Sequence, residues 1–88
     1  MIQNVQGTIC SISDIFETSN RFYKQRRLFV TIRLDDSPEF LFCEVKNEII
    51  DEILRCEIGA KIKFDLQLES KKNGNSWYTT IRIERLSK

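Results

Sequence analysis

The stretch GAKIKFDLQLESKKNGNSWYTTIRI, residues 59–83, decides the fold of this 88-residue chain. Across residues 62–68 every second side chain is apolar, which is the period of a half-buried strand. The Asn73-Gly74 pair that follows favours the positive φ angles of a hairpin turn. Residues 77–83 then resume an aromatic and β-branched composition. The stretch therefore predicts two antiparallel strands joined by a tight turn.

Three further strands are predicted upstream. Residues 2–16 are rich in β-branched side chains, but their apolar positions change parity, which predicts a long strand that is bent at Gly7 or bulged near Cys10. Residues 27–34 alternate cleanly between apolar and polar side chains, and residues 39–45 form a third strand after a turn. A strand that bends in this way can serve both halves of a barrel.

A short helix is predicted over residues 47–56, between the third and fourth strands. Asn47 is its expected N-cap, and Gly59 suits the exit from the helix. Its expected buried stripe consists of Ile49, Ile50, Ile53 and Leu54. The order of three strands, a helix and two strands predicts an all-β fold, a five-stranded OB-fold barrel, formed by residues 1–88 as a single domain. Closing the barrel buries a modest core without leaving loose sheet edges.

Composition argues against several classes of function. The chain has no histidine, and its three cysteines stand at spacings unlike those of metal sites, so we expect no metal and no cofactor. Without histidine there is no Ser-His-Asp or Cys-His arrangement and no common general base, so we expect no enzyme, no catalytic residues and no small-molecule substrate. No apolar run is long enough for a membrane span and no apolar leader is present, so we expect a cytoplasmic chain without a membrane partner.

Charge is segregated along the chain although the formal net charge is only +1. Residues 18–34 carry five basic side chains and no acidic one, residues 35–57 carry eight acidic and two basic ones, and residues 58–88 carry seven basic and three acidic ones. One interpretation is that these side chains only solvate the surface. The other is that the basic regions bind phosphate groups.

Three phenylalanines favour the second interpretation. If Leu41, Cys43 and Val45 face the barrel interior, Phe40 and Phe42 face outward, and Phe29 lies beside Arg27 and Arg33 on the polar face of the neighbouring strand. Bases stack on exposed rings, while arginines bind the phosphates. Two alternatives remain open: the third strand has the opposite parity and buries Phe40 and Phe42, or the rings lie in an interface between copies of the chain.

The loops that flank this face carry further candidate residues. Tyr23, beside Phe22, lies in the expected first loop among basic residues, and Lys71, Lys72 and Trp77 lie at the turn between the last two strands. These two loops usually border the binding groove of an OB fold. Trp77 can equally close one end of the barrel.

Residues 54–85 resemble the bacterial single-stranded DNA-binding proteins. Both run from a helix through a glycine, an alternating strand and a glycine-bearing turn into Tyr-Thr-Thr followed by β-branched residues, here residues 78–81. Residues 31–34 are similar to the second strand of that family. The resemblance implies stacking positions at Phe40, at Lys46 and near Lys71, and only Phe40 is aromatic, so Phe29 and Phe42 must compensate. We expect the chain to lack the acidic tail with which that family recruits partners.

A closer resemblance, over nearly the whole chain, is to a family of small bacterial OB-fold proteins catalogued only as a domain of unknown function. The matching features are Pro38 before an aromatic-rich strand, Glu44-Val45, Gly59, Glu69-Ser70, Asn73-Gly74, Trp77-Tyr78-Thr79 and Ile81-Arg82. The chain is also similar to the small primosomal OB-fold protein, which binds single strands as a dimer, in Gly7-Thr8-Ile9-Cys10 and Lys72-Asn73-Gly74. Both resemblances imply an OB fold, and single-strand binding follows as an expectation.

The sequence thus predicts a protein that binds single-stranded DNA, or RNA as a competing ligand, with little sequence preference. The expected binding residues are Arg21, Tyr23, Lys24, Arg26, Arg27, Phe29, Arg33, Phe40, Phe42, Lys71, Lys72 and Trp77. Because one barrel covers few nucleotides, we expect a homo-dimer or homo-tetramer that serves replication, repair or recombination. The alternative is a protein-interaction or assembly module that shares the fold but binds no nucleic acid.

Overall fold

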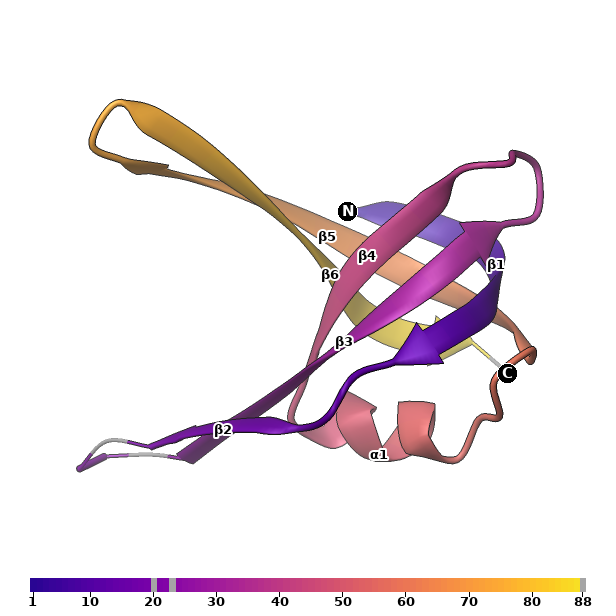
Figure 1. The fold of residues 1–88 in the computed structure, drawn as a ribbon, viewed down its shortest axis with the longest axis horizontal. Helices are drawn as coiled ribbons and strands as arrows, with labels where there is room; N and C mark the ends of the chain where they lie inside the picture. The colour runs from indigo at the N-terminus through magenta and orange to yellow at the C-terminus, as the bar shows by residue number, and fades with distance from the viewer. Residues whose placement is uncertain (20, 23, 88) are drawn as a thin grey trace.

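Residues 1–19, 21–22 and 24–87 are described by the computed structural model of the chain, which is all-β apart from one short helix (Figure 1). Its elements are β1 (Ile2–Ile12), β2 (Phe16–Ser19), β3 (Lys24–Leu34), β4 (Phe40–Lys46), α1 (Glu48–Leu54), β5 (Lys61–Asn73) and β6 (Ser76–Ser87). None of the described residues belongs to a helix that is long and apolar enough to cross a bilayer.

Five of the strands close into the predicted OB-fold barrel. The sheet runs in the order β1-β5-β6-β4-β3-β2, and an additional pairing of β1 with β3 closes it. Among the described residues all pairings are antiparallel except that of β4 with β6, where Glu44 lies opposite Arg82. The barrel thus leaves β2 outside its wall, paired with β3.

Strand β1 takes part in both halves of the barrel, as its changing parity predicts. It pairs with β5 from Ile2 to Thr8 and with β3 from Gly7 to Ile12, and its register to β3 shifts between Ile9 and Ser11. This shift confirms the bulge predicted near Cys10. At Gly7 a Cβ atom would clash with Cγ2 of the buried Ile32 and lie 2.7 Å from the backbone oxygen of Arg33. Only glycine lets the two backbones approach this closely.

The core lies inside the barrel and under α1, which covers one end of it (Figure 1). Its buried side chains are Ile9, Leu28, Val30, Ile32, Cys43, Val45, Ile50, Ile53, Phe64, Leu66 and Ile83. They come from every strand of the barrel and from the helix. The apolar positions of the alternating segments therefore supply the side chains on the inward face of the barrel.

The helix is shorter than predicted, its N-cap position is confirmed, and one residue of its predicted buried stripe is wrong. Leu54 is exposed, because the seven-residue helix turns only Ile50 and Ile53 fully into the core. Asn47 stands at the N-cap position, but its side chain caps no helical N–H. Its Oδ1 instead accepts a hydrogen bond from the backbone N–H of Arg26 (3.4 Å), which ties the start of the helix to β3.

The expected first loop is largely a hairpin. Residues 16–19 pair with residues 24–27, and we call this hairpin the first arm. The tip of the β5–β6 hairpin, residues 67–73 and 76–82, extends in the same way and is called the second arm. Both arms leave the barrel on the same side (Figure 1).

Asp65 is one of two acidic residues that the barrel buries among those the structure describes. Its carboxylate accepts hydrogen bonds from the backbone N–H of Asn4 (3.0 Å) and from Nη2 of Arg85 (2.7 Å). The bond from Asn4, then that from Arg85, lowers the pKa of Asp65 below its ordinary value. Asn4 has a φ of 59°, and the register of β1 to β5 shifts between Ile2 and Val5, so the irregular backbone here directs an N–H toward the carboxylate.

Candidate nucleic-acid interface

The outward face of β3 and β4 carries the phenylalanines that the sequence singles out. Phe40 and Phe42 are 60% and 63% exposed, whereas Cys43 and Val45 are completely buried. The parity assumed for the third predicted strand is therefore confirmed, and the reversed parity is excluded. Burial raises the pKa of the Cys43 thiol to about 12, as expected for a thiol used as a small apolar core residue.

Three rings form an aromatic row (Phe16, Phe29 and Phe42) across β2, β3 and β4. The rings of Phe29 and Phe42 are stacked, with centroids 5.0 Å apart and an interplanar angle of 4°. Phe16 meets Phe29 edge-on at 6.1 Å. The backbone of Phe29 is held at this place by Ser13, whose Oγ accepts its N–H (2.8 Å) and whose N–H bonds to its carbonyl oxygen (2.8 Å).

Phe16 is an aromatic residue of this face that sequence reasoning missed. It lies opposite Arg27 in the β2–β3 pairing and is half exposed. No local pattern pointed to it, because the change of apolar parity within residues 2–16 reflects the bulge near Cys10. Phe29 contacts Phe42 and Phe16 and is only partly exposed, so Phe40 and Phe42, which are 60% and 63% exposed, offer more open ring surface.

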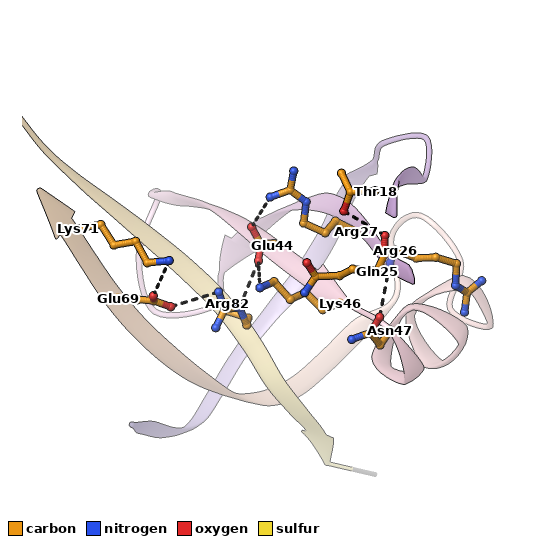
Figure 2. Close-up of polar contacts among 10 residues, drawn as sticks. All are labelled: Thr18, Gln25, Arg26, Arg27, Glu44, Lys46, Asn47, Glu69, Lys71 and Arg82. Atoms are coloured by element: carbon orange, nitrogen blue, oxygen red, sulfur yellow. Dashed lines mark hydrogen bonds and ion pairs between the residues drawn. The ribbon is translucent and has the colours of Figure 1, made fainter. Parts of the chain in front are cut away.

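Beside the aromatic row, Glu44 holds three cations (Figure 2). Its carboxylate lies 3.7 Å from Nη1 of Arg27, 3.4 Å from Nζ of Lys46 and 3.2 Å from Nε of Arg82. Glu44 itself is only 6% exposed, although it lies on the same face as the exposed phenylalanines. Glu44 on β4 therefore forms ion pairs with Arg27 on β3 and with Arg82 on β6. We call Arg27, Lys46 and Arg82 the cation cluster.

A second carboxylate extends the ion-pair network into the second arm. Oε2 of Glu69 lies 3.2 Å from Nη2 of Arg82, and Oε1 lies 3.1 Å from Nζ of Lys71. The hydrogen bond and charge of Lys71, followed by those of Arg82, lower the pKa of Glu69. The network therefore runs from β3 through β4 and β6 to β5 (Figure 2).

The expected phosphate-binding residues are distributed over this face and both arms. Arg27 and Lys71 belong to the ion-pair network, and Arg26 forms an ion pair with an aspartate of α1 (3.6 Å). Lys24 and Arg33 are exposed, on the first arm and on β3. Ion pairs therefore orient Arg26, Arg27 and Lys71 before any ligand is bound.

Arg21, Lys72 and Trp77 lie at the tips of the arms. The guanidinium of Arg21 lies 6.0 Å from the ring centroid of Phe22, and Nζ of Lys72 lies 6.0 Å from that of Trp77. Tyr23 lies outside the described residues. The exposed fraction of Trp77, 67%, decides between its two possible positions: Trp77 lies on the second arm and does not close the end of the barrel.

Strand alternation places Tyr78, rather than Trp77, on the face of the cation cluster. Tyr78 and Arg82 are four residues apart in β6 and therefore share a face, whereas Trp77 lies on the other face of the arm. Tyr78 is exposed. The second arm thus offers this face an aromatic side chain that was not among the expected binding residues.

The rest of the described surface has a hollow but no cluster of metal ligands. Within the described part of the chain, no three cysteine, aspartate or glutamate side chains gather closely enough to hold a metal ion. The hollow, of about 570 Å³, is bordered by Arg55, Cys56, Lys61, Lys63 and Leu86 among others. It contains none of the exposed aromatic residues of the β3–β4 face.

Comparison with known proteins gives a family and no function. No curated protein and no solved structure matches the sequence. Residues 4–87 match the family described as Domain of unknown function (DUF3127). This match covers nearly the whole chain, and the protein therefore belongs to the DUF3127 family.

Proposed function

We propose that the protein binds single-stranded DNA with little sequence preference, on the face of β3 and β4 between the two arms. The observation that carries the proposal is the presence of Phe40 and Phe42, both more than half exposed, on a sheet face that also carries a cluster of cations. Large apolar side chains exposed together commonly mark a binding surface. Cations around them make a nucleic acid the fitting partner.

In this proposal the aromatic rings bind the bases by stacking, and the cations bind the phosphates by charge. Bases stack on Phe40, Phe42 and Tyr78, each contact contributing roughly 1–3 kcal/mol, and they do so with little regard to sequence because every base has a π-face. The phosphates interact with cations on the face and on the arms, such as Arg33 and Lys71, which lies opposite Tyr78 in the β5–β6 pairing. RNA has the same stacking surfaces and phosphates, so it competes unless the 2′-hydroxyl is rejected.

The arms suit a flexible polymer better than a small ligand. They extend from the same side of the barrel and diverge from one another, one continuing β3 and the other continuing β5 and β6 (Figure 1). One such face covers few nucleotides, so we propose a homo-dimer or homo-tetramer that places several faces on one strand, in the cytoplasm. The resemblance to the bacterial single-stranded DNA-binding proteins and to the primosomal OB-fold protein supports this proposal.

The test is fluorescence anisotropy of a labelled oligo-dT of about 30 nucleotides, with a duplex of equal length and an oligo-U alongside, at several salt concentrations. We expect micromolar or tighter binding that prefers the single strand and weakens as salt is added. Phe42→Ala is expected to weaken binding roughly tenfold, since about 1.4 kcal/mol of stacking corresponds to a factor of ten. No binding at low salt would refute the proposal.

Ile58→Ala is the matched control. Ile58 is as exposed as Phe40, but it lies in the turn between α1 and β5, away from both arms (Figure 1). Its replacement removes exposed apolar surface without touching the proposed face, so DNA affinity should stay at the wild-type value. Equal losses in Phe42→Ala and Ile58→Ala would mean that the rings do not stack on bases.

A second candidate function, protein assembly without nucleic acid, rests on a different surface. Leu68 and Trp77 are exposed on the face of the second arm that points away from Tyr78. An apolar hairpin face of this kind fits a protein partner. If assembly is the function, Trp77→Ala changes the oligomeric state measured by light scattering, and the anisotropy assay shows no DNA binding.

A further inference from the structure

We propose that Lys46 and Arg82, together with Arg27, form the centre at which this face binds the phosphate of a nucleotide, and that the buried Glu44 positions these three cations. The inference rests on the proposed function and goes beyond it, because it assigns binding to Lys46 and Arg82. It also gives Glu44 a positioning role.

The charges in the cluster do not cancel. Three cations surround Glu44, which leaves an excess of two positive charges, and the neighbouring pair of Glu69 and Lys71 adds none. An excess of positive charge on a partly buried surface is screened less by salt than one on fully exposed side chains. It therefore favours a bound anion.

Glu44 contacts only some of the hydrogen-bond donors of the three cations. A lysine ammonium has three donors and a guanidinium has five, while the contacts to Glu44 involve one nitrogen of each cation. Arg27 Nε is buried and has no hydrogen-bond partner among the residues that the structure describes. The cluster thus has donors left for the oxygens of a phosphate.

The cations are already held in place before a ligand arrives. Side chains of Arg27, Lys46 and Arg82 are 38%, 27% and 21% exposed, which is low for residues of these types on a protein surface. Part of their rotamer entropy has therefore been lost on folding, and binding a phosphate does not incur that loss again.

The cluster also lies at the right place relative to the rings. Glu44 is opposite Phe29 in the β3–β4 pairing and follows Phe42 by two residues on the same face of β4. Two residues along a strand span about 7 Å. This separation lets one nucleotide place its base on Phe42 and its phosphate on the cluster.

The test compares three charge-removing variants, Lys46→Gln, Arg82→Gln and Lys61→Gln, in the oligo-dT assay at salt concentrations from about 50 to 200 mM. Lys61 is an exposed lysine on β5 that lies opposite Thr8 of β1, outside the cluster. Each cation that contacts a phosphate contributes about 0.7 to the slope of log affinity against log salt for a single strand. We expect Lys46→Gln and Arg82→Gln each to lower the slope by about that amount and to weaken binding roughly tenfold at low salt, and Lys61→Gln to leave both at wild-type values.

Two further variants separate binding from structure. Lys46→Arg keeps the charge and should restore the slope, which a merely structural defect would not do. Glu44→Gln adds one net positive charge to the cluster, so pure charge attraction predicts tighter binding. Because Glu44 positions the cations, we expect weaker binding instead, with little change in slope.

If the wild-type protein binds DNA and both Lys46→Gln and Arg82→Gln keep its slope of log affinity against log salt, the phosphate centre is overturned and the proposed function is left intact. An equal loss of affinity and slope in Lys61→Gln would also overturn it, because any positive charge on the surface would then contribute equally to DNA binding. Tighter binding by Glu44→Gln would overturn the positioning role. If the wild-type protein binds no single strand, the proposed function and this inference both fail.

Discussion

Replacing Glu44 by glutamine should destabilise the protein strongly for so small a change in shape. Removing one partner of a buried ion pair typically costs about 3–5 kcal/mol, because the remaining charge is buried without compensation. Here the carboxylate is 6% exposed, but its three partners retain between 21% and 38% of their side-chain exposure, so water compensates part of the loss. The glutamine oxygen can still accept the hydrogen bond that Nε of Arg82 donates at 3.2 Å.

These considerations reduce the expected loss in the free energy of unfolding to about 2 kcal/mol. For a domain of this size, a loss of 1 kcal/mol lowers Tm by about 4–8 °C, so Glu44→Gln should lower Tm by about 8–16 °C. The assay is thermal and urea unfolding followed by far-UV circular dichroism, since the exposed Trp77 is a poor reporter of the core. Glu84→Gln, on the same β6 strand as Arg82 but exposed, is the control and should change stability by less than about 0.5 kcal/mol.

Salt distinguishes the electrostatic cause from a packing defect. In Glu44→Gln the three cations repel one another without a carboxylate between them. Added salt screens that repulsion and should stabilise the variant more than the wild type. A loss below about 0.5 kcal/mol, or a loss that salt does not reduce, would refute the view that Glu44 holds the cluster together electrostatically.

Three further outcomes are expected. Folding lowers the pKa of Asp65 from the ordinary 3.8, so Asp65 contributes stability that is present above pH 3.8 and is lost as the pH falls through the lower, folded-state pKa. In urea unfolding, the difference in stability between wild type and Asp65→Asn should therefore shrink in acid. A difference that stays constant with pH would contradict this. Gly7→Ala should lose about 2 kcal/mol in the same assay through its clash with Ile32, and a loss near zero would show that the strands can separate there. Since burial raises the pKa of Cys43 to about 12, Cys43→Ala should leave the number of thiols that react quickly at about pH 8 unchanged, whereas Cys10→Ser should reduce it by one.

The strands and the outward position of the β3–β4 phenylalanines follow from short-range patterns, which is why the sequence predicts them. Alternation with a period of two identifies the inward face of residues 27–34, 39–45 and 62–66, and it places Phe40 and Phe42 outside, whereas Leu68 continues the pattern beyond the barrel and is exposed. The irregularity near Cys10 is also local, since a bulge changes the parity of the very residues that contain it.

The parts that sequence reasoning missed depend on contacts between distant residues. Strand β2 is only four residues long, and it forms because β3 extends beyond the barrel and offers it an edge. The environment of Glu44 depends on Arg82, 38 positions further along the chain, and on a parallel pairing of β4 with β6 that no local pattern encodes. A lone glutamate that follows two phenylalanines in a strand therefore indicates an unusual position but not its three partners.

The charge on the β3–β4 face also bears on the choice between an anionic partner and a second copy of the chain. In a symmetric dimer each residue of an interface lies near the same patch of the other copy. If the β3–β4 face were that interface, two clusters with an excess of two positive charges each would face one another, and such juxtapositions cost several kcal/mol. The other face of the second arm, with Leu68 and Trp77, carries no comparable cluster among the described residues. Copies of the chain should therefore meet through the second arm, which leaves the rings and the cation cluster open to a strand of nucleic acid.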